Sequence, residues 1–223
     1  MANITFPRAE IEKHIKLDEK TIEQISMFGT SIKVSGHEVE IEVFPNRPDL
    51  LSQQGFLRAI KAFLGKESGL KIYKVKNPEP NYKVKIDSSV KDIRPYIACA
   101  IVKNLSFNNE KIKEIIELQE KIHATLGRNR KKLAIGIYPL DKITLPITYL
   151  AKKPEDITFA PLESTSPMSA LEILKQNPAG RAYAHLLEGK EKFPIFMDAK
   201  KNILSLPPII NSNETGKIST ETK

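Results

Sequence analysis

The stretch LSLPPIINSNETGKISTETK, residues Leu204–Lys223, decides how the second half of this chain is interpreted. It begins with the pattern of a strand, because the apolar Leu204 and Leu206 flank Ser205. Two prolines and two isoleucines follow, and then a run of hydroxyl and amide side chains. Such residues commonly form turns and caps, yet they are also neutral donors and acceptors that can hold an amino acid and position a water. A polar tail and a pocket wall therefore both remain open.

The composition is that of a globular protein. Of the 223 residues, 40% are hydrophobic and 28% are charged, which excludes an intrinsically disordered chain. No run approaches the roughly eighteen apolar residues of a membrane-spanning helix, and the first residues show no secretory signal. The single cysteine, Cys99, lies in an apolar run, so we expect a buried, inert thiol in a reducing compartment. We therefore expect a cytoplasmic protein without a membrane partner.

Positive charge is concentrated at one place in the sequence. The net charge is +8, which favours polyanionic partners. Residues 121–132, KIHATLGRNRKK, carry five basic side chains and no acid. They lie at the end of a predicted helix, where the helix dipole stabilises cations. Arg128 and Arg130 could equally present two guanidinium groups to a phosphate backbone, so a solvated surface and a nucleic-acid contact both stay open.

The first eighty residues predict a small α+β module. A short helix is expected from Pro7, and Asp18 can cap a second helix. Residues 32–44 predict a hairpin, in which residues 38–43 alternate acidic and apolar side chains. Residues 46–65, NRPDLLSQQGFLRAIKAFLG, predict an amphipathic helix. Residues 75–82, with two prolines, are the expected linker, so residues 1–80 form the first predicted domain.

Residues 83–223 predict a second domain that combines a mixed sheet with helices. A helix is expected from Asn108 or Asn109 to Leu126, and another with Ser166 at its start. The strands are expected at residues 83–86, 96–102, 133–138, 193–197 and 203–206. The two domains together give an α+β fold.

Strong catalytic and metal-binding motifs are absent from the sequence. It contains no P-loop, no GxGxxG, no HExxH, no paired CxxC and no GxSxG. The four histidines (His14, His37, His123 and His185) have no metal-ligand spacing, so a surface or structural role is favoured for each. If the chain is catalytic, a positioned water acting on an activated ester suits the polar C-terminal stretch better than a side-chain nucleophile.

Four stretches carry a resemblance to a known family: NRPDLLSQQGFLRAIKAFLG, IRPYIACAIV, LQEKIHATLGRNRKKLAIGIYPLDKI and ILSLPPIINSNETGKISTETK. In this order they resemble the N-terminal part of the phenylalanyl-tRNA synthetase β subunit of archaeal and eukaryotic type. The resemblance implies a heterotetrameric ligase with an α subunit and tRNA(Phe) as partners. It implies ATP and Mg²⁺ for the whole ligase and no cofactor within this chain. It also implies a B3/B4 editing domain that hydrolyses Tyr-tRNA(Phe).

The resemblance also assigns roles to individual residues. The tyrosine pocket and its surrounding loop are expected to contain Ser205, Phe196, Pro207, Pro208, Asn211, Ser212, Thr220, Glu221, Thr222 and His185. The segment near the 3′ end of tRNA is expected to contain Arg128, Arg130 and Lys131. No catalytic side chain and no metal ligand is assigned.

The family pattern continues past TETK into another strand and a long helix, so we expect a C-terminally truncated B3/B4 domain with an incomplete pocket. Two alternatives remain open. One is a non-catalytic fragment that binds tRNA or the α subunit. The other is a free-standing trans-editing protein, against which the synthetase-like NRPDLL segment counts.

Overall fold

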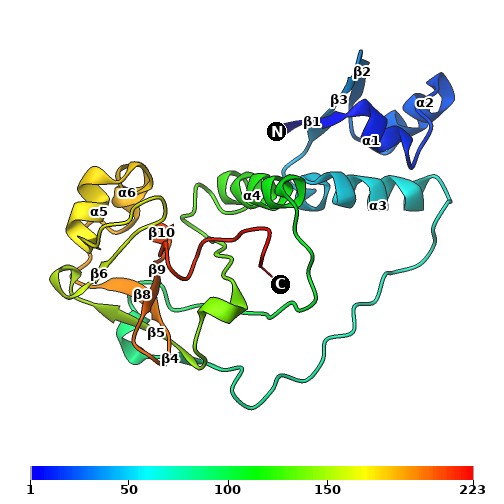
Figure 1. The fold of residues 1–223 in the computed structure, drawn as a ribbon. Coiled ribbons are helices and arrows are strands. Elements are labelled where there is room, and N and C mark those ends of the chain that lie inside the picture. The colour runs from blue at the N-terminus through cyan, green and yellow to red at the C-terminus, as the bar shows by residue number, and fades with distance from the viewer. Residues whose placement is uncertain (1, 223) are drawn as a thin grey trace. The chain divides into compact units, whose positions relative to one another are not determined.

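The computed structural model describes residues 2–222, which divide into two compact units (Figure 1). Unit 1 comprises Met1–Val75 and Glu114–Lys132, and unit 2 comprises Lys76–Lys113 and Leu133–Lys223. The predicted domains, residues 1–80 and 83–223, divide the chain close to Val75 but do not include its return to unit 1. Both units combine helices with sheets, so the predicted α+β class is confirmed.

Unit 1 is built on a three-stranded antiparallel sheet in the order β1-β3-β2. The predicted hairpin and helices are confirmed, whereas the first strand was not predicted. The elements are β1 (Ala2–Pro7), α1 (Arg8–Glu12), α2 (Glu19–Met27), β2 (Ile32–Ser35), β3 (Glu38–Val43), the 3-10 turn η1 (Pro48–Leu50), α3 (Gln53–Phe63) and the later turns of α4 (Asn109–Ala124).

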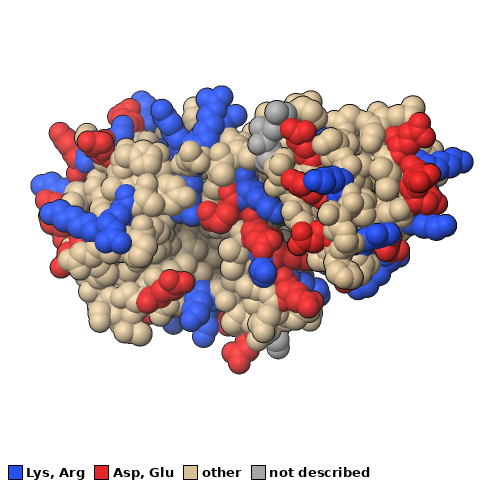
Figure 2. Space-filling model, turned by 90° about the horizontal axis from the view of Figure 1, so that it is seen from above, with Lys and Arg blue, Asp and Glu red and all other residues tan. Residues whose placement is uncertain are grey.

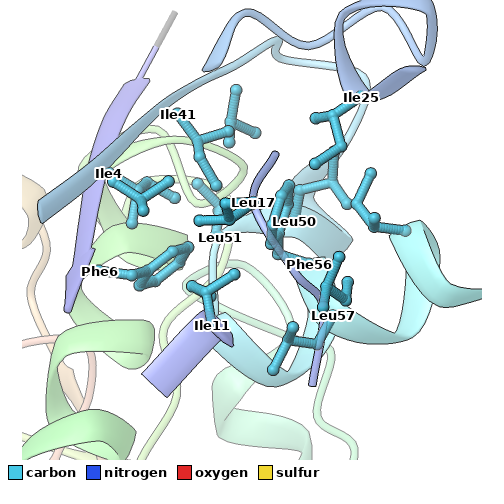
Figure 3. Close-up of a cluster of buried hydrophobic side chains, with 14 residues drawn as sticks. Ile4, Phe6, Ile11, Leu17, Ile25, Ile41, Leu50, Leu51, Phe56 and Leu57 are labelled. Atoms are coloured by element: carbon cyan, nitrogen blue, oxygen red, sulfur yellow. The ribbon is translucent and has the colours of Figure 1, made fainter. Parts of the chain in front are cut away.

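One apolar cluster holds unit 1 together (Figure 3). Strand β3 contributes every second residue to it, among them Ile41, because successive side chains of a strand point to opposite faces. Helix α3 contributes Phe56, and the Ser52 hydroxyl begins this helix by accepting a hydrogen bond from the Gly55 amide (3.0 Å). Leu118 of α4 packs against the same cluster, which explains why Glu114–Lys132 belongs to unit 1.

Unit 2 is built on a five-stranded sheet in the order β10-β9-β8-β5-β4. Neighbouring strands are antiparallel except for the parallel pair β4 and β5, so the predicted mixed sheet is confirmed. The strands are β4 (Val84–Ile86), β5 (Ile147–Lys152), β8 (Phe193–Met197), β9 (Ile203–Leu206) and β10 (Ile210–Asn211). Strands β8 and β9 have the bounds that the sequence predicted.

The two faces of this sheet are covered differently. A second sheet, β6 (Thr158–Phe159) with β7 (Met168–Ser169), leads into the neighbouring helices α5 (Ala170–Gln176) and α6 (Pro178–Tyr183) (Figure 1). Ile173 of α5 shares a core with Ile195 of β8 and Leu206 of β9. Tyr149 and Phe196 instead form a smaller cluster with residues of the connection after β4.

Two predicted strands are wrong. Residues 96–102 and 133–138 have no regular secondary structure. An apolar run shows that a segment tends to be buried, but it does not show which backbone will pair with it. Cys99, in the first of these runs, is exposed rather than buried.

The start predicted for the helix after Ser166 is also wrong. The helix begins at Ala170, because Ser169 has Glu172 three residues later and forms a reciprocal capping box with it. None of the helices between residues 2 and 222 has the length and apolarity needed to span a bilayer.

The core of unit 1 predicts a large difference between two phenylalanines of α3. Phe56 is completely buried, whereas Phe63 is 45% exposed. We expect Phe56→Ala to lower the free energy of unfolding by about 3–5 kcal/mol, because it leaves a cavity in the cluster. Phe63→Ala is the matched control and is expected to cost much less. Urea unfolding followed by circular dichroism measures both, and equal losses would contradict the described burial of α3.

Candidate functional site

Ser205 lies in a row of side chains that crosses the sheet of unit 2. In the strand register, Ser205 of β9 is opposite Asn211 of β10 and opposite Phe196 of β8. Phe196 is in turn opposite Tyr149 of β5. Because directly opposite residues project from the same face of a sheet, these four side chains lie on one face. The structure thus brings together three residues of the predicted tyrosine pocket and adds Tyr149.

A second tyrosine, Tyr138, contacts this row from a segment outside the sheet. The Tyr138 hydroxyl donates a hydrogen bond to Ser205 Oγ at 2.7 Å. Its ring meets Phe196 edge-on, with ring centroids 6.4 Å apart and an interplanar angle of 85°. Burial raises the pKa of Tyr138 well above its ordinary value, so its hydroxyl stays protonated and remains a donor.

Asn211 holds the same segment against the row. Its Nδ2 donates to the Ile137 carbonyl at 3.2 Å, next to the Tyr138 contact with Ser205. Gly216 packs closely behind it, because a Cβ at that position would lie 2.4 Å from the Asn211 Cβ. The position of Asn211 therefore depends on the absence of a side chain at residue 216.

Tyr149 projects from the same face, but its hydroxyl forms a hydrogen bond with a different partner. Its ring contacts Phe196, with centroids 4.8 Å apart, but its hydroxyl donates to the Arg94 carbonyl at 2.7 Å. Two tyrosine rings thus contact Phe196, and one of the two hydroxyls reaches Ser205.

The predicted loop residues have mainly structural contacts. The Pro207–Pro208 peptide bond is cis and lies in the turn between β9 and β10. Ser212 is buried; its amide donates to the Leu204 carbonyl at 2.8 Å, and its Oγ accepts from the Glu214 amide at 3.3 Å. These bonds shape the loop that follows β10.

The other predicted pocket residues do not join this row. His185 is exposed on the 3-10 turn η5 (Ala184–Leu186). Thr220 and Glu221 are exposed in a turn that the Ser219 amide closes by donating to Thr222 Oγ1 at 3.0 Å. Within the described part of unit 2, the strand partners and hydrogen bond of Ser205 involve none of them.

The basic segment forms a strained turn in unit 1. Arg128, Asn129 and Arg130 have φ angles of 50°, 53° and 64°, in the left-handed region that costs L residues roughly 1–2 kcal/mol each. The turn is closed by the Lys132 amide, which donates to the Gly127 carbonyl at 2.8 Å. Three successive residues other than glycine thus adopt an unfavourable conformation at the place where positive charge is concentrated.

Arg130 anchors this turn to α4. Its Nη2 donates to Glu120 Oε1 at 2.9 Å, and its side chain is only 13% exposed. Glu120 also lies 3.2 Å from Nδ1 of the buried His123. The predicted tRNA-binding residue Arg130 therefore has a structural partner, and Lys131 is exposed on the same turn.

Arg128 and Lys132 instead line an open cleft within unit 1. The cleft has a volume of about 490 Å³, and its lining also includes Phe44, Leu51 and Leu126. None of its lining residues is acidic. Sequence reasoning missed Lys132, because its place beside Arg128 depends on the left-handed turn. On the face shown in Figure 2, basic and acidic side chains are interspersed. The cleft lined by Arg128 and Lys132 therefore says more about a possible anion-binding surface than the net charge of the chain does.

The resemblance implies Mg²⁺ and ATP for the whole ligase and not for this chain. Between residues 2 and 222, no group of three or more His, Cys, Asp or Glu side chains could hold a metal ion. The sequence also lacks a phosphate-binding glycine loop.

Known proteins match this chain over its whole length. The phenylalanine–tRNA ligase β subunit of Archaeoglobus fulgidus is 40% identical over 224 residues, covering 100% of this chain and 40% of the relative. That of Methanosarcina barkeri is 39% identical over 224 residues, covering 100% of this chain and 41% of the relative. By this homology, the chain belongs to the phenylalanine–tRNA ligase β-subunit family. No protein-family profile matches the chain.

A solved structure agrees with this assignment. An N-terminal fragment of the phenylalanyl-tRNA synthetase β subunit from Pyrococcus horikoshii matches with a TM-score of 0.88 and 36% sequence identity. The match covers 100% of this chain and 66% of that fragment. The resemblance carried by the four sequence stretches is thus confirmed. The chain spans about two fifths of the length of the curated relatives it matches, and the roles of its individual residues stay predictions.

The two arginines of the strained turn are expected to differ in their effect on stability. Arg130→Ala removes the hydrogen bond to Glu120 and should lower the free energy of unfolding by about 1 kcal/mol, since Glu120 is partly exposed. Arg128→Ala is the matched control, because it places the same residue in the same backbone region and should cost less than about 0.5 kcal/mol. Chemical unfolding of both variants is the measurement. An Arg128→Ala loss as large as that of Arg130→Ala would contradict the anchoring role.

Proposed function

We propose that this chain carries the editing site of a phenylalanine–tRNA ligase β subunit and hydrolyses the ester of Tyr-tRNA(Phe). In this proposal its partners are tRNA(Phe) and the ligase α subunit, and it acts in the cytoplasm. The observation that carries the proposal is the contact of Ser205 with a phenol. Ser205 Oγ accepts the Tyr138 hydroxyl at 2.7 Å while Phe196 presents an aromatic wall, so this place has the chemistry needed to bind a tyrosine side chain.

The need for such a site follows from the similarity of the two amino acids. Tyrosine is phenylalanine with one added hydroxyl, and an apolar pocket rejects such a substrate by only about 10²-fold. A second site can instead recognise the hydroxyl by a hydrogen bond. Phenylalanine would then leave a buried polar group such as Ser205 without its partner, which weakens its binding.

The chemistry requires orientation more than a nucleophile. Ser205 is buried within the sheet and binds the phenol, so it is not placed to attack the ester. In the proposed reaction, the oxygen of a positioned water bonds to the ester carbonyl carbon. The bond from that carbon to the ribose oxygen breaks, and the proton from the water passes to the ribose oxygen. The row of Ser205, Phe196 and Asn211 contributes by holding the amino acid in place.

We propose that unit 1 contacts the RNA backbone through Arg128 and Lys132, with Lys131 beside them. The support is that Arg128 and Lys132 point into a cleft without acidic residues, whereas Arg130 is held by Glu120. Glycine would adopt the left-handed φ of Arg128 without strain. An arginine in that conformation favours a functional reason for its side chain.

One alternative function has a specific observation in its favour. The Tyr138 ring occupies the place beside Ser205 where a substrate side chain would bind. A chain that binds tRNA or the α subunit without catalysis fits this occupied place, and a hydrolysis assay distinguishes it from the editing site.

Substitution of Ser205 tests the editing proposal. In the full-length β subunit assembled with its α subunit, Ser205→Leu should lower the rate of Tyr-tRNA(Phe) deacylation at least about tenfold, because it removes the acceptor and puts a larger apolar side chain in its place. Ser219→Leu, on the exposed C-terminal turn, is the matched control and should leave the rate unchanged. The rate is followed as release of labelled tyrosine. If the unmodified enzyme leaves Tyr-tRNA(Phe) intact, the editing proposal is wrong.

Salt dependence tests the RNA contact. Arg128→Ala with Lys132→Ala should reduce the slope of log affinity for tRNA against log salt by about 1.5, because two phosphate contacts are lost. Lys20→Ala with Lys33→Ala removes the same charge from exposed positions of unit 1 and should change the slope much less. Filter binding between about 50 and 200 mM salt is the measurement. Equal slopes for both double variants would show that Arg128 and Lys132 are solvated surface residues without phosphate contacts.

A further inference from the structure

We infer that Tyr138 is an internal competitor for the amino-acid side chain that binds at Ser205, so that every substrate must displace its phenol. This inference rests on the proposed editing function and adds a residue that the resemblance did not assign. Its basis is one juxtaposition: the phenol of Tyr138 already makes with Ser205 and Phe196 the contacts that a bound tyrosine would make.

The position of the Tyr138 phenol is well defined. It lies 2.7 Å from Ser205 Oγ, and its ring is edge-on to Phe196. Ser205 is only 1% exposed, so its hydroxyl has little access to water and depends on a protein or ligand partner. A second phenol cannot occupy the same place while Tyr138 remains there.

The segment that carries Tyr138 can release it without breaking the sheet. Residues 133–139 form no strand or helix. The contacts of this segment with the row include a hydrogen bond from Tyr138 to Ser205 and one from Asn211 to the Ile137 carbonyl. Gly136 lies two residues before Tyr138, and a Cβ there would lie 2.7 Å from the Tyr138 hydroxyl oxygen. A change in the Tyr138 side chain alone would free Ser205, with the backbone still held by Asn211.

The exchange has different consequences for the two amino acids. An entering tyrosine replaces the Tyr138 hydrogen bond to Ser205 with an equivalent one. An entering phenylalanine removes that bond and leaves Ser205 without a partner, which costs free energy in a buried site. Tyr138 therefore weakens the binding of both side chains by the same factor. The ratio of the two affinities is therefore set by Ser205. By lowering both affinities, Tyr138 keeps the correct product, Phe-tRNA(Phe), from binding.

The test is Tyr138→Phe, which keeps the ring and removes the competing hydroxyl. In the full-length β subunit assembled with its α subunit, we expect kcat/KM for deacylation to rise about three- to tenfold for Tyr-tRNA(Phe). The smaller rate with Phe-tRNA(Phe) should rise by the same factor. Tyr96→Phe is the matched control, because it removes the same hydroxyl from unit 2 at an exposed position outside this row. It should leave both rates unchanged.

A binding measurement on the 223-residue chain separates this inference from the editing proposal. The probe is 3-fluoro-L-tyrosine followed by fluorine NMR, and Tyr138→Phe should bind it about three- to tenfold more tightly than the unmodified chain or Tyr96→Phe. Unchanged binding and unchanged rates would assign Tyr138 to packing and overturn the inference. A fall in the Tyr-tRNA(Phe) rate alone would show that its hydroxyl contacts bound substrate, which also overturns it. An unmodified enzyme that never deacylates Tyr-tRNA(Phe) counts against the editing proposal, whereas tighter probe binding would still support the competitor.

Discussion

A buried hydroxyl without a hydrogen-bond partner costs free energy, and this cost organises the surroundings of Ser205 in the candidate site of unit 2. Ser205 is buried in β9 between two apolar residues that face the other side of the sheet. Its partner comes from Tyr138, which belongs to a segment without regular structure. The same bond therefore satisfies the serine, attaches residues 133–139 to the sheet and places an aromatic ring against Phe196. The atoms that pack this part of unit 2 are thus the ones that the proposed recognition of tyrosine would use.

In unit 1, neighbouring basic residues have different roles. The guanidinium of Arg130 is used internally, because it pairs with Glu120 and anchors the left-handed turn to α4. Anchoring one residue of the turn orients the others, so Arg128 and Lys132 reach the cleft beside Phe44. Neighbouring residues of one basic run thus have opposite environments. The net charge of the run could not distinguish them.

Patterns with a local cause were predicted well. The α+β class, the bounds of β8 and β9 and the hairpin of unit 1 follow from alternation and turn residues, which depend on near neighbours only. The family resemblance located Ser205, Phe196 and Asn211, which the register then placed side by side. Tyr138 was not predicted, because residues 133–138 were interpreted as a buried strand. An apolar run carries no information about its eventual partner.

The sequence by itself determined the helices and hairpin of unit 1, strands β8 and β9, the concentration of basic residues at 121–132 and the family to which the four stretches point. These features are set by side-chain chemistry at short separation along the chain. The tertiary structure alone decided that Tyr138 meets Ser205, that Arg130 is paired while Lys132 lines a cleft, and that Glu114–Lys132 packs with unit 1. The physical reason is that contacts between distant residues depend on which buried polar groups form hydrogen bonds with each other. Those partners meet only when the chain has folded.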